Sequence, residues 1–449
     1  MDYRFDGRLT ARDAKRHIPH QFAVPTDAAQ IEVCLRFAPA AGQDLTNLIT
    51  LSVYDPNGFR GAGHRGGAEH RVSLAASQAT PGYLPGPLPA GEWTVELDTH
   101  RIMPGEPVNY WLEVTVRNSL DASPAASRAA NASPVTRRGP GWYRGDLHTH
   151  THHSDADGLS VAGLVTAARR AGLDFIFLTD HNTTAGLPEL EAAGEDDLLT
   201  AAGLELTTFW GHALCLGTRQ WVDWRIRPGT GQIAQIAAET YAAGRIFIIA
   251  HPQSLGDPCC TGCAWRYGEM MPGAARLVEV WNGPWGGDSN NEASLALWYD
   301  WLNQGHRLVA TAGSDLHSVT DYDRRPGFNV IYADGLTEAA LLRALAVGHL
   351  YLSAGPQLAF QAQAADGSTA ISGDTVAGLV AFTLTWTACP ADAHIRVIAN
   401  GMLLHQWAAA PGNAQRGWQM TAADARWVLV EVRDRDGQIL AVTNPIFLG

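Results

Sequence analysis

Short stretches of alternating apolar and polar residues dominate the first quarter of the chain. They recur between residues 29 and 117 with clusters of Gly, Pro, Asn and Asp between them, as in QIEVCLRF, LITLSVYD, EWTVELD and YWLEVTV. An alternation of period two places successive side chains on opposite faces of a strand. Because no helical period interrupts these stretches, the pattern predicts a small antiparallel β-sandwich over residues 1–117. Ala, Ser, Pro and Arg then fill residues 118–141, which predicts a linker.

The pattern changes in the middle of the chain, where apolar β-rich runs alternate with helix-like stretches. VAGLVTAARRAG, GQIAQIAAETYAAG, NEASLALWYDWLNQG and LTEAALLRALAVG each end in Gly, the residue that favours the left-handed end of a helix. This alternation predicts an α/β fold with parallel strands over residues 142–355, either open or closed into a barrel. Short strands and the turn signal DRDGQ return afterwards, so residues 356–449 are predicted to form a second small β-sandwich.

Composition narrows the classes of protein that fit this pattern. A chain of 449 residues is too long for one ordinary core, and 46% hydrophobic with 17% charged residues is typical of globular proteins. The formal net charge of −13 argues against nucleic-acid binding, which needs a basic surface. The N-terminus is charged from its second residue, and no apolar run approaches the length of a membrane span. We therefore expect a cytoplasmic protein that binds neither nucleic acid nor a membrane.

Polar side chains follow the apolar runs of the middle region, at the points where strands are predicted to end. DFIFLT precedes His181, RIFIIA precedes His251 and RLVATAGS precedes Asp315. In GDLHTHTHHSDADG, His148 and His150 share one face of an extended segment. The carboxyl ends of barrel strands meet at one mouth, so these side chains are expected to converge there. Imidazoles beside carboxylates suit Zn, Mn or Fe, and the sequence predicts a metal centre.

Six motifs occur in the order GDLHTHTHHSD, LTDHN, GLELTTFWGH, IIAHP, EVWN and AGSDLH. In this order they resemble the PHP (polymerase and histidinol phosphatase) superfamily. With the terminal TNPIFL added, the chain is most similar to the CehA/McbA-like metallohydrolase branch of that superfamily. The resemblance covers residues 142–355 and implies a distorted seven-stranded βα barrel, (βα)7, that holds two or three divalent ions.

The resemblance also implies a role for each matching residue. Its metal ligands are His148, His150, Glu205 and Asp315 at a first ion, Glu205 as a bridge to a second ion with His212 and His251, and Asp155, His181 and His317 at a third. SDADG is longer than the family's usual spacing, so Asp157 stays an alternative to Asp155. His152 and His153 have no implied role and are expected to face solvent or support the ligands. Asp146 is expected to orient an imidazole of the first pair.

Ions held in this way can activate water for the hydrolysis of phosphate esters. The same centre can polarise the carbonyl group of a carbamate or carboxylic ester, so this alternative stays open. No Gly-x-Ser-x-Gly elbow and no phosphate-binding Gly-Lys loop occurs in the sequence. Amidohydrolases with two metals commonly bridge them with a lysine of the barrel. The only lysine of this chain is Lys15, outside the predicted barrel, which argues against a binuclear amidohydrolase. A non-catalytic protein that binds a glycan or a partner is a further alternative.

Several residues beside the implied ligands are candidates for contact with a small-molecule ester substrate. The pocket is expected to be lined by Asn182, Thr207, Trp210 and Asn282, with Arg324 and Arg325 as cationic groups for a phosphoryl oxygen. The cluster Cys259, Cys260 and Cys263 follows His251 and is expected to form a structured rim loop, with a disulfide as one option. For the two sandwiches, a scaffold, a lid and a contact in a homo-oligomer all remain open.

Overall fold

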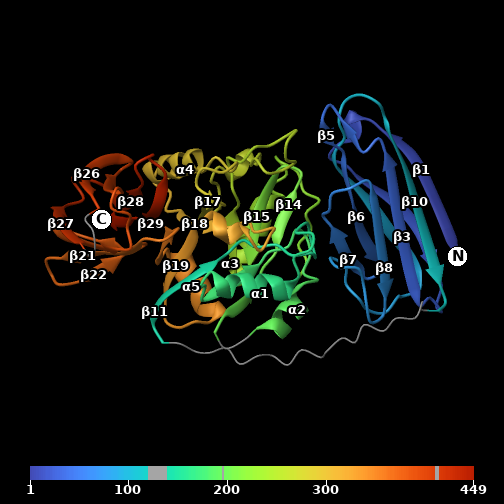
Figure 1. Ribbon diagram of the computed structural model, residues 1–449, viewed down its shortest axis with the longest axis horizontal. Helices are drawn as coiled ribbons and strands as arrows, with labels where there is room; N and C mark the ends of the chain where they lie inside the picture. Colours follow the sequence, from blue (N-terminus) through green and yellow to red (C-terminus); the bar gives the residue numbers. More distant parts are fainter. Residues whose placement is uncertain (120–138, 195–196, 410–413) are drawn as a thin grey trace.

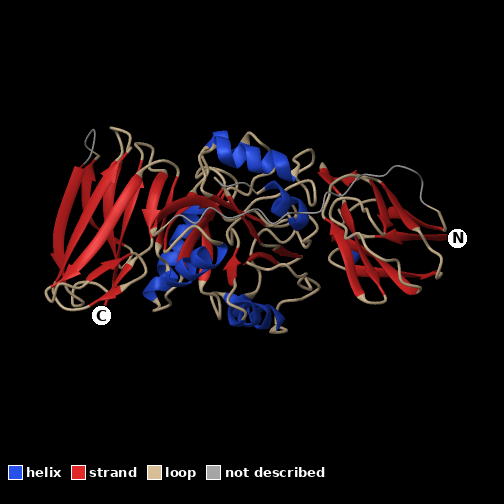
Figure 2. Cartoon of the chain, turned by 90° about the horizontal axis from the view of Figure 1, so that it is seen from below, coloured by secondary structure: helices blue, strands red, loops and turns tan. Residues whose placement is uncertain are grey.

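The computed structural model describes residues 1–119, 139–194, 197–409 and 414–449. Most of the predicted linker, residues 118–141, therefore lies outside the described residues. A body of strands stands at each end of the chain, and a mixed region of strands and helices lies between them (Figure 1). Figure 2 shows the helices gathered around this central region. The predicted mixed α/β class is confirmed, with strands in the majority.

The N-terminal body consists of two four-stranded antiparallel sheets. One sheet has the order β1 (Asp2–Leu9), β10 (Val108–Arg117), β3 (Gln30–Ala38) and β8 (Glu69–Ala75), and the other has the order β2 (His17–Val24), β9 (Gly91–Arg101), β6 (Leu48–Asp55) and β7 (Gly58–Gly63). Along β10 buried and more exposed residues alternate, as the period-two pattern requires. Leu35, Leu112, Leu51 and Trp93 pack into the core between the sheets. A small ribbon of β4 (Ala41–Gly42) and β5 (Leu45–Thr46) and a short 3-10 helix, Ala11–Asp13, complete this body.

The central region contains two groups of strands and the α-helices of the described chain. The first group is β13 (Leu199–Ala202), β12 (Phe175–Leu178), β11 (Gly141–Asp146), β19 (Phe328–Ala333) and β20 (Leu350–Ser353), and the second is β14 (Glu205–Thr208), β15 (Gly211–Leu216), β16 (Ile246–Ile249), β17 (Leu277–Asn282) and β18 (Val309–Gly313). The helices are α1 (Val161–Arg170), α2 (Leu187–Ala193), α3 (Gln232–Ala242), α4 (Asn291–Asn303) and α5 (Glu338–Val347), with 3-10 turns at Gly268–Met270 and Asp321–Arg324. The glycines predicted at four helix ends all have positive φ, which confirms that prediction: Gly172, Gly244, Gly305 and Gly348.

The hydrogen-bond ladders do not show the regular βα alternation of a seven-stranded barrel. The strands β11, β12 and β13 are parallel to one another, as are β16, β17 and β18, but β14, β15 and β19 pair antiparallel with their neighbours. Only Phe209 and Trp210 separate β14 from β15, and a helical crossover needs about a dozen residues. Isolated bridges, Thr149 with Leu316 and His181 with Glu205, connect the two groups of strands.

The C-terminal body shares a sheet with the central region. Strand β20 pairs with β29 (Ile439–Thr443), and the sheet continues through β28 (Trp427–Arg433), β25 (His394–Ala399) and β26 (Met402–Ala408). The second sheet has the order β22 (Thr369–Ile371), β21 (Gln357–Ala364), β24 (Val380–Thr387) and β27 (Ala414–Met420), while β30 (Ile446–Leu448) pairs with β23 (Thr375–Val376) and β28. On β28, Leu429 packs into the central core and Val430 into the C-terminal core. The predicted boundary at residue 355 is therefore crossed by a continuous sheet.

Among the described residues, no helix combines the length and the apolar character that crossing a membrane requires.

Candidate metal centre

Six strands, β11, β12, β14, β15, β16 and β18, and the segments that follow them bring the implied ligands to one place. Bridged Thr149 keeps its segment extended after β11, so that the flanking residues His148 and His150 project to the same side. His181 follows β12, His251 follows β16, and the remaining ligands come from β14, β15 and the segment after β18. The register of β14 and β15 pairs Thr207 with His212, which puts Glu205 and His212 on one face. The structure brings together all nine residues that the resemblance implies as ligands.

Glu205 lies at the middle of this group, and its two oxygens face different histidines. Oε2 lies 3.3 Å from His148 Nε2 and 3.4 Å from His150 Nε2. Oε1 lies 3.1 Å from His212 Nδ1 and 3.3 Å from His251 Nε2. A carboxylate that divides its oxygens in this way has the geometry of a bridge between two ion positions.

Asp315 completes the first position. Its Oδ1 lies 3.0 Å from His150 Nε2 and 3.5 Å from His148 Nε2. Two donors that bind one tetrahedral zinc at 2.0–2.1 Å are separated by about 3.3 Å. The spacing of the donors therefore matches that of ligands around a shared ion.

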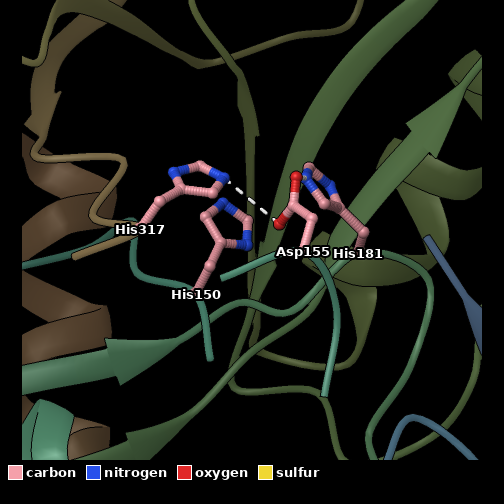
Figure 3. Close-up of side chains that lie close together, drawn as sticks. All are labelled: His150, Asp155, His181 and His317. Carbon is pink, nitrogen blue, oxygen red and sulfur yellow. Dashed lines mark hydrogen bonds and ion pairs between the residues drawn. The ribbon is translucent and has the colours of Figure 1, made fainter. Parts of the chain in front are cut away.

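The third position is formed by Asp155, His181 and His317, whose side chains point toward one another beside His150 (Figure 3). Asp155 Oδ2 lies 3.2 Å from His181 Nε2, and Oδ1 lies 3.1 Å from His317 Nε2. Asp157 is exposed. Of the two aspartates that the sequence left open, the structure places Asp155 among the histidines.

Several buried atoms of the centre have no hydrogen-bond partner in the described structure. They are His148 Nε2, His150 Nε2, Glu205 Oε2 and both ring nitrogens of His212. Leaving such atoms unpaired in a protein interior costs about 1–3 kcal/mol each. Bound cations would satisfy Glu205 Oε2 and one ring nitrogen of each of these histidines, so the donor set fits divalent ions.

The charges of the centre are strongly coupled. Burial alone raises the pKa of Glu205, but His181 and His148 outweigh burial and hold this pKa well below its usual range. Burial disfavours the cationic form of His148, yet the carboxylates of Asp315 and Glu279 hold its pKa well above the ordinary value. In the same way, burial opposes but Asp155 raises the pKa of His317 to about 10. Ions must compete with protons for these imidazoles.

Two of these residues have a left-handed backbone that residues other than glycine rarely adopt. His251 has φ of 28° and Asp315 has φ of 51°. Such conformations cost about 1–3 kcal/mol each and concentrate at functional sites. The fold therefore stabilises strained backbone where it presents donors to the centre.

Glu279 belongs to the site although the sequence pattern did not single it out. It lies inside β17 and is buried, and its Oε1 is 3.1 Å from His148 Nδ1. Its Oε2 accepts from the backbone N–H of His251 and from Asn282 Nδ2, both at 3.1 Å. The available signal was a carboxylate within the apolar run of EVWN, since Glu is rarely buried without a partner.

The expected role of Asp146 needs a correction. Among the described residues Asp146 forms no hydrogen bond with an imidazole; it accepts from the backbone N–H groups of His148 and Ser314 and from the hydroxyls of Ser314 and Tyr322. Burial raises its pKa to about 6. Asp146 therefore fixes the backbone of the first ligand segment, while Glu279 orients the ring of His148.

Replacing Glu279 by Gln is expected to weaken binding at the first ion position by about 10- to 100-fold, because a neutral amide supports the imidazole less than a carboxylate does. Calorimetric titration of the metal-stripped protein with Zn²⁺ measures this change. Glu239→Gln, an exposed site on α3, is the matched control. Equal affinities of the Glu279→Gln variant and the unaltered protein would contradict the assigned role.

His152 and His153 were expected to face solvent or to support the ligands, and neither is exposed. His153 is buried, and its Nε2 lies 3.1 Å from Glu189 Oε1, while His152 Nδ1 lies 3.2 Å from the carbonyl oxygen of Leu159. Asp180, which follows β12 after Thr179 and directly precedes His181, accepts from Thr151 N–H and Oγ1, both at 2.8 Å. These contacts shape the loop that carries Asp155.

The residues expected to contact substrate divide into three groups. Thr207 lies at the centre, with its Oγ1 2.5 Å from His181 Nδ1, and Asn282 Nδ2 donates to Asp315 Oδ2 at 3.2 Å. The side-chain amide of Asn182 donates to the Thr207 carbonyl oxygen and accepts from the Thr207 N–H, so its role is to hold β14. Trp210 lies under the ammonium group of Lys15.

Arg324 and Arg325 do not fulfil the expected phosphate-binding role in this structure. Both are exposed, and among the described residues neither forms a hydrogen bond or ion pair with the centre. Arg324 is the last residue of the 3-10 turn Asp321–Arg324, and Arg325 follows it directly. Arg144, which precedes the first ligands, donates to the Ala171 carbonyl group and stacks on Phe328.

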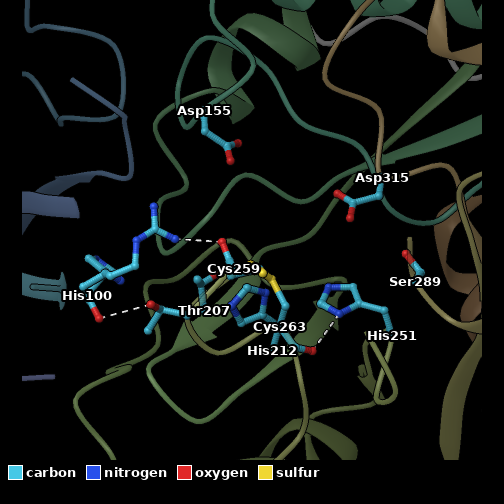
Figure 4. Close-up of a disulfide and its surroundings, with 12 residues drawn as sticks. His100, Asp155, Thr207, His212, His251, Cys259, Cys263, Ser289 and Asp315 are labelled. Atoms are coloured by element: carbon cyan, nitrogen blue, oxygen red, sulfur yellow. Dashed lines mark hydrogen bonds between the residues drawn. A yellow bond between two sulfur atoms is a disulfide. The ribbon is translucent and has the colours of Figure 1, made fainter. Parts of the chain in front are cut away.

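A cavity of about 270 Å³ opens beside the centre, between the first ion position and a cysteine-rich loop. It is lined by His251, Ser254, Leu255, Cys259, Cys260, Cys263, Asp288, Ser289 and Asp315. Cys260 and Cys263 form a disulfide, and Cys259 is free and exposed. The carbonyl oxygen of Cys263 lies 3.2 Å from His251 Nδ1, so the disulfide loop also contacts one of the implied ligands (Figure 4).

No protein-family model and no curated protein matches the chain. A solved two-domain protein from Bacteroides vulgatus, containing a predicted PHP-like metal-dependent phosphoesterase, is 16% identical, covers 72% of this chain and 100% of its own, and has a TM-score of 0.38. A putative metal-dependent phosphoesterase from Bifidobacterium adolescentis is 18% identical, covers 39% of this chain and 87% of its own, and has a TM-score of 0.26. Because both TM-scores are below 0.5, the functional assignment rests on the geometry of the centre.

Proposed function

We propose that this protein is a PHP-type metal-dependent hydrolase of the CehA/McbA-like branch, which uses two or three divalent ions, Zn, Mn or Fe, to hydrolyse phosphate esters of small molecules. The observation that supports this proposal is Glu205, whose oxygens divide between two sets of histidines in a fully buried position. A structural ion pair needs only two partners, whereas nine converging donors match the number that two or three ions bind.

When bound, divalent ions lower the pKa of water and stabilise negative charge on the atoms that react. The chain's own residues determine where this chemistry takes place. Asp315 and His251 line the cavity, so a substrate that enters it meets both residues. Asn282 holds the Asp315 carboxylate through Oδ2, and Glu279 holds the backbone of His251. These contacts fix the donors before substrate arrives.

The cavity favours one alternative substrate class. No arginine or lysine is among the residues that line it, and the guanidinium groups considered above are exposed or bound elsewhere. Phosphoryl oxygens usually receive cationic side chains in addition to metal ions. A lining without them suits a neutral carbamate or carboxylic ester on the same centre, which is our second candidate function.

A substrate panel separates the two candidates. The metal-loaded protein is assayed with p-nitrophenyl phosphate, bis-p-nitrophenyl phosphate, p-nitrophenyl acetate and an aryl N-methylcarbamate, with a chelator-treated sample as the control. Metal-dependent hydrolysis of a phosphate ester is the expected result. Turnover of only the acetate or carbamate would favour the second candidate. No turnover by fully loaded protein would overturn both and leave a binding protein.

A further inference from the structure

The N-terminal sandwich lies directly against the metal centre. Its sheet β2–β9–β6–β7 is the one that faces the central region (Figure 1). The His17 ring stacks on Phe209 with centroids 4.8 Å apart and meets the edge of Trp224 at 4.6 Å. Phe59 of β7 stacks on Trp221 at 4.4 Å. These are packed aromatic contacts, so the sandwich is joined to the face that carries the ligands.

One set of sandwich residues holds the loop that carries Asp155. Arg65 donates to the carbonyl oxygens of Ser154 at 3.1 Å and His152 at 2.7 Å. Gly82 donates its backbone N–H to His153 Nδ1 at 3.0 Å. A Cβ atom at Gly82 would lie 2.5 Å from the His153 carbonyl oxygen, so the close approach requires glycine.

A second set holds the disulfide loop on the other side of the centre. Arg101 donates to the carbonyl oxygens of Pro258 and Cys259, and Thr261 donates to the carbonyl oxygen of His100 (Figure 4). Lys15, the chain's only lysine, pairs with Asp257 at 2.6 Å. The sandwich therefore contacts both loops that border the ion positions.

His64 follows β7 of the sandwich and lies beside a histidine of the centre. Its ring centroid lies 4.6 Å from that of His181, and the edge of His100 supports it at 4.7 Å. His64 is half-buried, and among the described residues neither of its ring nitrogens forms a hydrogen bond. An imidazole in either protonation state carries at least one N–H donor. His64 thus offers an unused donor beside a ligand of the third ion position.

We infer that the N-terminal sandwich forms one wall of the active site and that His64 donates a hydrogen bond to the substrate oxygen held at the ions. This inference rests on the proposed function, because it requires an ester or its product to bind at the centre. It gives the sandwich a role in substrate recognition.

The test compares His64→Ala and His64→Gln with the unaltered metal-loaded protein, with inorganic phosphate as the probe. Loss of a hydrogen bond to a charged group is expected to raise the inhibition constant of phosphate about 10- to 100-fold. The metal content should stay unchanged, and His64→Gln should retain part of the affinity through its amide N–H. His70→Gln is the matched control, since His70 stacks on Phe37 inside the sandwich.

Unchanged phosphate inhibition in both His64 variants would overturn the inference. Loss of one ion equivalent in both variants would also overturn it, because His64 would then be a ligand. Thermal unfolding identifies a variant that fails to fold. If His64→Ala does not fold, phosphate inhibition of His64→Gln tests the inference. Failure of the proposed function is distinguishable, since it is seen in the unaltered protein as absent metal or absent hydrolysis.

Discussion

Replacing Glu205 by Gln is expected to abolish hydrolysis, with a fall in rate of about 1,000-fold or more. The amide keeps the shape of the side chain but removes the charge and turns one oxygen into a nitrogen that does not bind cations. Because the two oxygens face separate sets of histidines, the change affects both ion positions. Metal content, measured by plasma mass spectrometry, should fall to one equivalent or less per chain.

Glu239→Gln makes the same chemical change on the exposed face of α3 and should leave metal content and rate unaltered. A Glu205→Gln variant that retained both its ions and its activity would show that Glu205 is a structural residue.

Replacing Gly313, the last residue of β18, by Ala is expected to displace side chains of the metal centre. A Cβ atom there would lie 2.2 Å from Glu279 Oε1 and 2.4 Å from His148 Cβ. Both neighbours are fully buried, so neither can move into solvent. Gly313→Ala should destabilise the protein by about 1–3 kcal/mol and displace the His148 ring from the first ion. Thermal unfolding and metal analysis measure the two effects.

Gly268 provides the control for this experiment, because an added Cβ there meets no atom within 4 Å. Gly268→Ala should unfold at the temperature of the unaltered protein and bind the same number of ions. A Gly313→Ala variant as stable and as well loaded as this control would contradict the packing described around His148.

The candidate ligands could be named from the sequence because six ordered motifs resemble those of a known superfamily and several of these residues follow apolar strands. An extended segment places His148 and His150 on one side, whereas Asp315, which has the same spacing to His317, has a left-handed backbone with φ of 51°. Glu279 was less accessible to this reasoning, because it lies within a strand and acts through its partners. Its role depends on two other segments of the chain, which place the ring of His148 and the backbone N–H of His251 beside its carboxylate.

Contacts between distant parts of the chain explain most of what the sequence did not predict. The pairing of β20 with β29 joins residues that are about ninety positions apart, as in Leu352 with Val442. The position of His64 beside His181 similarly depends on how the sandwich packs on the centre. Local patterns carry no information about such packing. The same reason explains Arg324 and Arg325, which are near His317 in sequence but are exposed.

The most direct test of a multinuclear hydrolytic centre is a stepwise titration of the metal-stripped protein with Mn²⁺ or Zn²⁺ while hydrolysis of the best substrate is followed. Activity that rises with added metal and reaches its plateau at two or three equivalents per chain is the predicted result. Activity that is complete before any metal is added, or that reaches its plateau at one equivalent, would contradict the account.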